Sequence, residues 1–464
     1  MYQDLRAFIS RLEEEDQLVR VRERLSPKFE IPGMIKYFTE ARNLGLFFEN
    51  VEGYSLPVVA NLVGTRERLA TAFGVSDADF PLIYRTRMER RIQPVLVSDA
   101  PAKQVEILNN VDIIRTVPVL THHARDASPY FTSAITMAKD PDTGLSGMGI
   151  HRIQVRDRNT VAIFLATPPL SHFLARSELK GTPLEIAIVI GVDPITFFAS
   201  VGWAPSGTDK LEIAGGLRGQ AVEVVKCSTI DLKIPANAEF VLEGRIIPGE
   251  RQPEGPFGES TGYYFSNRSP VAKITAITHR KDAIYQALVP FSGEDGVLLN
   301  VGWEMKHLPE LQKVYPFVKL VHFTNTLLVA TVQIRKTSDG DARNIIEELW
   351  SNPFVKIVIV LDDDVDPYDA EEVNWAVATR VQPARDVVIK EGMPGLSIDP
   401  SAGRQEVTGE FAILANETSK IGIDATKPMG DIETYERTDI PDEVKTKIGP
   451  IVRNYLTASK KPAR

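Results

Sequence analysis

The sequence predicts a multidomain α/β protein in which two mixed α/β regions flank a β-rich centre. The chain has 464 residues, which is too long for one ordinary hydrophobic core, so two or three domains are expected. Mixed helix and strand patterns give way near residue 105 to short β-branched runs, and the mixed patterns return after residue 290. We therefore expect domains over residues 1–105, 106–295 and 296–464.

The first region has the patterns of a small α/β module. Apolar residues recur at helical spacing from Leu5 to Leu12, which predicts an amphipathic helix over residues 4–15. The runs "QLVRV" and "LPVVANLVG" predict strands, and "TRERLATAFGV" predicts a second helix that stops near a glycine.

The central region has a sequence pattern that predicts antiparallel strands. Runs such as "YFTSAITMAKD", "PLEIAIVIG" and "EFVLEGRIIPG" are short and rich in β-branched residues. Turn clusters such as "DPDTG" and "HRKDA" separate them. This pattern is typical of an antiparallel barrel or sandwich.

The last region alternates strand and helix. "HFTNTLLVATVQI" and "FVKIVIVLDDD" each predict a strand, and the helices predicted in "DARNIIEELWS" and "AEEVNWAVATRV" follow them. This βαβα order predicts a separate α/β domain.

Composition excludes several classes of protein. A net charge of −9 argues against a nucleic-acid scaffold, and the chain has no apolar run long enough for a transmembrane helix. The first residues lack the cationic start and apolar block of a signal peptide. Cys227 is the only cysteine and lies in the strand-like run "AVEVVKCSTIDL", so we expect a buried, unreactive thiol and a cytoplasmic protein.

Some acidic and histidine clusters allow more than one interpretation. The acids of "VLDDDVDPYDAEE" could hold a metal, but Asp366 before Pro367 is a good helix start, so we expect solvated capping residues. His122 and His123 are adjacent and would face opposite sides of a strand. The sequence has no Walker phosphate loop, no GxGxxG fingerprint and no GxSxG elbow.

The stretch "PEGPFGESTGYY" holds Glu254 and Glu259 among residues that predict a loop. Two acids in an exposed loop are unremarkable by themselves. Arg152, His172 and Glu212, taken singly, are equally compatible with structural roles.

Taken together, blocks in one order along the chain resemble the UbiD-like decarboxylase family. The blocks include "GMGIHR", "LSH", "LEIAGGLRG", "PEGPFGESTGYY" and "SKIGIDATKP", and they span roughly residues 130 to 430. The resemblance implies a central split β-barrel, flavin-reductase-like in architecture, that binds the cofactor. It also implies a C-terminal α/β domain that makes oligomer contacts, in a homodimer or a homohexamer.

The resemblance implies an activity as well. Members of the family use prenylated FMN, supplied by a separate flavin prenyltransferase, for reversible decarboxylation of aromatic, heteroaromatic or α,β-unsaturated acids. Glu259 matches the proton donor, and Arg152 and Glu254 match the other members of a Glu-Arg-Glu network. The residues that match cofactor-binding positions are Ile150, His151, Arg152, Leu170, Ser171, His172 and Glu212.

One position departs from the family pattern. His172 and Glu212 match ligands of a divalent ion, usually manganese, that bridges the protein and the cofactor phosphate. The third ligand is an asparagine in the family, whereas this chain has Gly147. Water or Ser146 could complete the site, or a monovalent ion such as K+ could replace the manganese. Two other roles stay open: a carboxylase or a subunit of a carboxylating complex, and a non-catalytic flavin-binding assembly protein.

Overall fold

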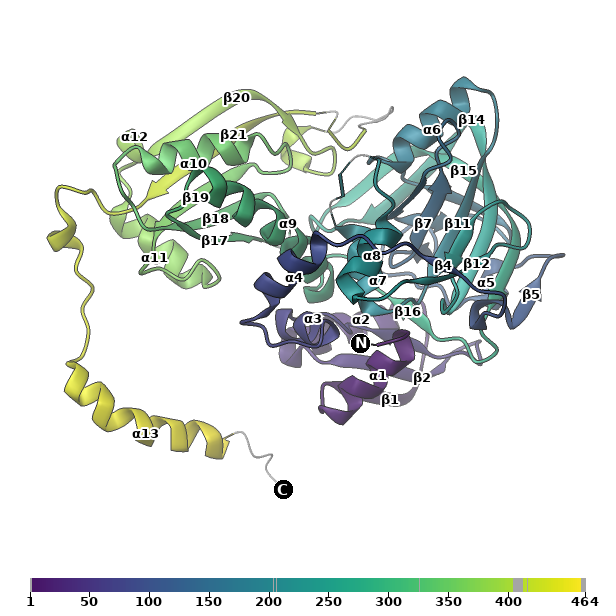
Figure 1. The fold of residues 1–464 in the computed structure, drawn as a ribbon, viewed down its shortest axis with the longest axis horizontal. Coiled ribbons are helices and arrows are strands. Elements are labelled where there is room, and N and C mark those ends of the chain that lie inside the picture. The colour runs from purple at the N-terminus through teal and green to yellow at the C-terminus, as the bar shows by residue number, and fades with distance from the viewer. Residues whose placement is uncertain are drawn as a thin grey trace.

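The computed structural model describes residues 2–202, 204–205, 207–324, 326–403, 412–414 and 416–459. Figure 1 shows three regions along the chain, coloured purple, teal and green, with the last helix standing apart from them in this view. No helix among the described residues is long and apolar enough to cross a membrane.

The N-terminal region contains the predicted helices and strands. Asp4 accepts a hydrogen bond from the Ala7 amide and so caps the first helix, as expected for aspartate in this position. The elements are α1 (Leu5–Glu14), β1 (Leu18–Leu25), α2 (Glu30–Arg42), β2 (Gly45–Val51), β3 (Val58–Ala60), α3 (Arg66–Ala72) and α4 (Phe80–Met88). The sheet order is β1-β2-β3-β16, and β16 (Tyr285–Ala287) comes from the end of the central region.

The central region is built on a nine-stranded sheet with the order β6-β9-β10-β15-β14-β11-β7-β8, to which β5 adds beside β15. Its strands are β5 (Val105–Ile107), β6 (Tyr130–Phe131), β7 (Ile135–Lys139), β8 (Ser146–Ile150), β9 (Ile153–Val155), β10 (Thr160–Ile163), β11 (Leu184–Ile190), β14 (Phe240–Gly258) and β15 (Tyr264–His279). A smaller sheet joins β4 (Val95–Leu96), β12 (Glu223–Lys226) and β13 (Lys233–Pro235). The helices are α5 (Ile113–Thr116), α6 (Leu170–Leu179), α7 (Pro194–Val201) and α8 (Lys210–Arg218).

The stretch predicted to be a loop is mostly strand. Pro253 to Gly258 continue β14 opposite β15, and only residues 259–263 form the turn. The prolines misled the prediction because a proline cannot donate to a sheet ladder. The strand β11 pairs only with Phe240–Ile246 of β14, so the prolines lie beyond it, where they remove no hydrogen bond to that neighbour.

The C-terminal region is an α/β domain, as predicted, with sheet order β17-β18-β19-β21-β20. Its elements are α9 (Gly293–Val314), β17 (Val318–Phe323), β18 (Val329–Ile334), α10 (Asp341–Trp350), β19 (Ile357–Asp362), α11 (Ala370–Arg380), α12 (Pro383–Asp386), β20 (Val387–Gly395), β21 (Asn416–Ala425) and α13 (Asp442–Ser459). Two expectations were wrong in detail. "HFTNTLLVATVQI" spans the turn between two paired strands, β17 and β18, and α11 is capped by Asp369 rather than begun at Asp366.

Two acids at the end of β19 pair with cations instead of serving as solvated caps, whereas Asp369 in the same stretch is exposed and caps α11, as expected of a solvated cap. Asp362 and Asp364 both pair with Arg380, at 2.8 and 2.9 Å, and Lys427 pairs with Asp364 at 2.7 Å. Buried carboxylates need such partners because an unpaired buried charge is costly.

Apolar packing joins the regions unevenly. Phe8, Phe73 and Phe198 belong to one core, so the N-terminal module and the central region pack together. Trp350 lies in a separate core within the C-terminal domain. A small cluster that contains Phe164, Leu396 and other apolar residues joins that domain to the central sheet.

Candidate active site

Residues far apart in sequence form an ionic cluster at the end of the β14–β15 hairpin. Arg152 lies between β8 and β9, Glu254 lies on β14, and Glu259 opens the turn after β14. Arg152 Nη2 donates to Glu254 Oε2 at 2.5 Å, and Nη1 donates to Glu259 Oε1. The structure thus brings together the three residues that the sequence singled out as a network.

The side chains of the ionic cluster are almost fully buried. The exposed fractions of the side chains are 6% for Arg152, 0% for Glu254 and 12% for Glu259. Phenylalanine rings surround the guanidinium, whose carbon lies 4.5 Å from the Phe164 ring centroid and 5.1 Å from that of Phe265. Charge–charge and cation–π interactions are stronger in such a water-poor setting.

Glu254 accepts hydrogen bonds from more side chains than Glu259 does. The Tyr130 hydroxyl donates to Glu254 Oε1 at 3.0 Å, and the Ser269 hydroxyl donates to Oε2 at 3.4 Å. Burial, followed by the nearby charge of Glu254, raises the pKa of Tyr130, so its hydroxyl keeps its proton. Nothing in the sequence marked Tyr130 or Ser269, because their relation to Glu254 exists only in the folded sheet.

The turn that carries Glu259 is closed by its own backbone. The Glu259 amide donates to Tyr263 O at 2.9 Å, and the Gly262 amide donates to Glu259 O at 2.9 Å. Gly262 has a φ of +80°, which favours glycine. The Thr261 hydroxyl donates to Ile398 O at 3.2 Å, so the C-terminal domain contacts this turn directly.

Two residues predicted to bind the cofactor have buried polar atoms that could bind a ligand. Ser171 Oγ and Arg152 Nε are buried and have no hydrogen-bond partner among the described residues. Buried polar atoms are normally paired, so these two fit a bound polar group. Burial lowers the pKa of His151 to about 4, so its ring is neutral, and Nδ1 lies 3.2 Å from Phe164 O. Leu170 is buried and Ile150 is half-buried, which suits an apolar lining.

The expected manganese ligands do not form a three-ligand site. Glu212 accepts a hydrogen bond from Gln93 Nε2 at 2.6 Å. A Cβ atom at Gly147 would lie 2.6 Å from Phe173 Cε2 and 3.0 Å from Pro169 Cγ, so side chains fill the space that an asparagine would need. Among the described residues, no group of three His, Cys, Asp or Glu side chains could hold a metal. His172 and Glu212 remain as two donors, and their role as ligands of a metal stays a prediction.

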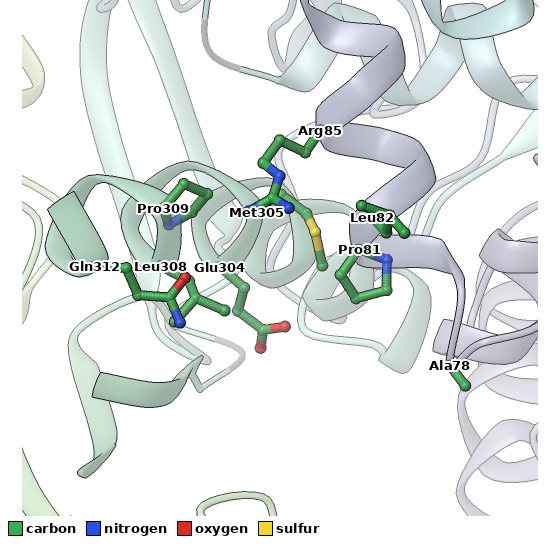
Figure 2. Close-up of a pocket in the computed structure, with 9 residues that line it drawn as sticks. All are labelled: Ala78, Pro81, Leu82, Arg85, Glu304, Met305, Leu308, Pro309 and Gln312. Carbon is green, nitrogen blue, oxygen red and sulfur yellow. The ribbon is translucent and has the colours of Figure 1, made fainter. Parts of the chain in front are cut away.

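Two other features, Cys227 and a cavity, lie outside the ionic cluster. Burial raises the pKa of the Cys227 thiol, which agrees with an unreactive cysteine. A cavity of about 240 Å³ lies between α4 and α9. Figure 2 shows residues that line it, among them Leu82, Arg85, Glu304 and Met305. Glu304 is already engaged there, with Arg66 at 2.5 Å and His322 at 2.7 Å. None of the lining residues belongs to the ionic cluster, so this cavity is a feature of the junction between domains.

A buried arginine between two carboxylates, set on a half-barrel sheet between two α/β regions, is an arrangement suited to acid–base chemistry. The chain matches the N-terminal domain of the 3-octaprenyl-4-hydroxybenzoate carboxy-lyase (UbiD) family over residues 9–84, the Rift-related domain over 94–293 and the C-terminal domain over 298–425. It therefore belongs to the UbiD family, and it is an enzyme of the carboxy-lyase class, as the sequence predicted.

Relatives match over nearly their whole length. An anhydromevalonate phosphate decarboxylase from Methanosarcina mazei is 34% identical, with 94% of this chain and 99% of the relative covered. One from Methanothermobacter thermautotrophicus is 32% identical, over 93% and 99% of the two chains.

Solved structures have the same fold. The UbiD-class enzyme HmfF from Pelotomaculum thermopropionicum, in complex with FMN, has a TM-score of 0.88 and 39% identity, over 94% of this chain and 97% of that one. Vanillic acid decarboxylase from Sedimentibacter hydroxybenzoicus has a TM-score of 0.81 and 30% identity, over 97% and 99%. These similarities confirm the predicted family and fold class.

Proposed function

We propose that this chain catalyses reversible, non-oxidative decarboxylation of an aromatic, heteroaromatic or α,β-unsaturated acid with prenylated FMN, and that Glu259 is the proton donor. The observation that carries the proposal is the Arg152 guanidinium, held between Glu254 and Glu259 inside an aromatic cage.

The chemistry sets two tasks for the protein. Loss of CO2 leaves an electron pair on carbon, and prenylated FMN, when bound, supplies the electron sink for that pair. The chain must orient the substrate carboxylate and then deliver a proton to the carbon from which CO2 has left. The buried Arg152 Nε and Ser171 Oγ would meet polar groups of cofactor or substrate, and Ile150, His151, Leu170, His172 and Glu212 would complete the binding site.

The hydrogen-bond partners decide which acid gives the proton. Two carboxylates that share one cation in a dry site do not both stay ionised easily. Glu254 accepts hydrogen bonds from Arg152, Tyr130 and Ser269, which suits an ionised carboxylate. Glu259 accepts one from Arg152 and is the more exposed acid, so we assign the proton transfer to Glu259, the acid that a substrate can reach. A positioned acid of this kind typically accelerates a reaction ~10²–10⁴-fold.

The surroundings support a flat, apolar substrate body. Leu396 and Ile413 of the C-terminal domain pack against Phe164, one of the rings around Arg152. An unsaturated acid could lie against such side chains with its carboxylate toward the guanidinium. The relatives named as decarboxylases of anhydromevalonate phosphate and of vanillic acid support both an unsaturated and an aromatic acid as candidates.

The remaining parts of the proposal concern partners and setting. We infer that a flavin prenyltransferase supplies the cofactor, that the chain forms a homodimer or homohexamer, and that it works in the cytoplasm. A carboxylating role would appear as net carboxylation under high bicarbonate, whereas a non-catalytic assembly protein would bind flavin without any turnover.

The first experiment is co-expression with a flavin prenyltransferase, followed by an absorbance and mass spectrum of the purified protein. CO2 release is then measured with anhydromevalonate phosphate, vanillic acid, 3,4-dihydroxybenzoic acid, cinnamic acid and a furan carboxylic acid. We expect bound prenylated FMN and turnover of at least one acid. A loaded protein that neither decarboxylates these acids nor carboxylates the products would refute the proposal.

A further inference from the structure

The buried carboxylate of Asp126 connects the loop over residues 122–127 to Gly258, the residue just before Glu259. Asp126 Oδ1 accepts a hydrogen bond from the Gly258 amide at 3.0 Å. Asp126 Oδ2 accepts from the amides of His122 and His123, at 3.1 and 2.8 Å. The Asp126 side chain is fully buried. A carboxylate with several backbone donors is a rigid anchor, because charge-assisted hydrogen bonds are stronger than neutral ones.

Further contacts extend this attachment to both sides of the Glu259 turn. The Ala127 amide donates to Pro256 O at 2.9 Å, and the Arg125 amide donates to the Tyr264 hydroxyl at 3.2 Å. Gly258 and Tyr264 face each other in the β14–β15 register, so they flank the turn that carries Glu259. The loop thus holds the base of the turn, whereas Arg152 holds the end of the Glu259 side chain.

The loop also explains the glycine before Glu259. A Cβ atom at position 258 would lie 2.3 Å from His123 Nδ1, so the imidazole packs directly on the backbone. Burial would raise the pKa of Asp126, but hydrogen bonds from His123 and Gly258 outweigh it and hold that pKa below its usual value. Asp126 is therefore ionised at neutral pH, and it lies 3.7 Å from His123 Nδ1.

We propose that Asp126 is a positioning residue for Glu259: through the Gly258 amide, and with the His123 ring against Gly258, it fixes the backbone from which the proton donor reaches the substrate carbon. The inference rests on the proposed function. It assigns Asp126 to the protonation step, not to substrate binding, because its contacts are with the backbone before Glu259.

The test is Asp126→Asn in the enzyme loaded with prenylated FMN, with Asp140→Asn as the control. The substitution keeps the size of the side chain but removes the charge and one acceptor. Asp140 is also buried and also accepts a backbone amide, that of Asp142 at 3.0 Å, but it lies in a different turn. The substrate is whichever acid of the screening set the wild type decarboxylates fastest.

Two readouts separate positioning from general damage. We expect Asp126→Asn to lower kcat by about ten- to a hundredfold, with KM within about twofold, because a small misplacement of a catalytic group costs up to about a hundredfold. In the protein without cofactor, backbone hydrogen–deuterium exchange should become faster in the peptide over residues 254–264. Asp140→Asn should leave both measurements at the wild-type values.

The outcomes are distinguishable. If Glu259→Gln is inactive but Asp126→Asn keeps wild-type kcat and exchange, the inference is overturned and the proposed function stands. If Glu259→Gln is active, the proposed proton donor itself is wrong. Should Asp126→Asn fail to fold, Gly258→Ala decides: we expect it to lower kcat about tenfold through its clash with His123, and we expect His123→Ala in the same chain to restore most of the loss. Wild-type kcat in Gly258→Ala would overturn the inference.

Discussion

Replacing Arg152 by lysine tests the centre of the proposed site. Arg152 donates from two different terminal nitrogens to two different carboxylates, Glu254 and Glu259. Lysine keeps the charge but has a single nitrogen without the planar fork, so it can hold one acid and not orient both. At least one charge-assisted hydrogen bond is lost, which costs about 1.5–3 kcal/mol. At about 1.4 kcal/mol per factor of ten, decarboxylation should slow by roughly ten- to a hundredfold.

The assay is decarboxylation by Arg152→Lys at matched cofactor loading, with the pH profile recorded beside it. Arg218→Lys is the matched control, because Arg218 has the same 6% exposed side chain and pairs with a buried carboxylate, Asp193, at 2.6 Å. Loss of rate in Arg152→Lys alone supports the account. A rate within about twofold of wild type and an unchanged pH profile would show that Arg152 takes no part in the reaction.

Three other expectations follow from named contacts. Tyr130→Phe removes a donor to Glu254 and should lower kcat by roughly tenfold with little change in KM; an unchanged kcat would contradict the network. Burial raises the pKa of Glu294 to about 7, so this carboxyl binds its proton more tightly in the folded protein than in the unfolded chain. The free energy of unfolding of the wild type should therefore fall relative to that of Glu294→Gln as the pH rises from about 5 to 8. Free-energy curves of the two proteins that stay parallel over this range would refute the expectation. Gly147→Asn should lower Tm because its Cβ would clash with Phe173, and metal analysis should show no gain of manganese; a stable variant with one manganese per chain would prove the opposite.

Local patterns predicted the elements well where periodicity and punctuation agreed. The helix α1 was predicted because Leu5 to Leu12 follow helical spacing, and its buried residues are the ones that this spacing selects. The prediction failed where tertiary pairing overrides a local signal. Pro253 and Pro256 predicted a loop, but Pro253 pairs with Arg268 of β15, and Pro256 lies in an irregularity between two paired parts of the same strand.

The same limit applies to the site. Arg152, Glu254 and Glu259 were found through family blocks, whereas Tyr130 and Asp126 were missed, because only the folded sheet brings them to Glu254 and Gly258. The glycine at position 147 was noticed as a missing ligand. That the Phe173 ring fills its place could not be predicted, since helix α6 and strand β8 meet only in the tertiary structure. The domain boundaries expected from the sequence remain a prediction.

The most direct measurement of the central claim is turnover by Glu259→Gln, loaded with prenylated FMN and compared with Glu243→Gln. Glu243 is a buried glutamate of β14, the strand that precedes Glu259, and it accepts hydrogen bonds from Ser228 and Thr229. If Glu259 gives the proton, Glu259→Gln should lose about a hundredfold or more of the decarboxylation rate while it binds the cofactor normally, and Glu243→Gln should keep most of the activity. Near wild-type product formation by Glu259→Gln would contradict the account.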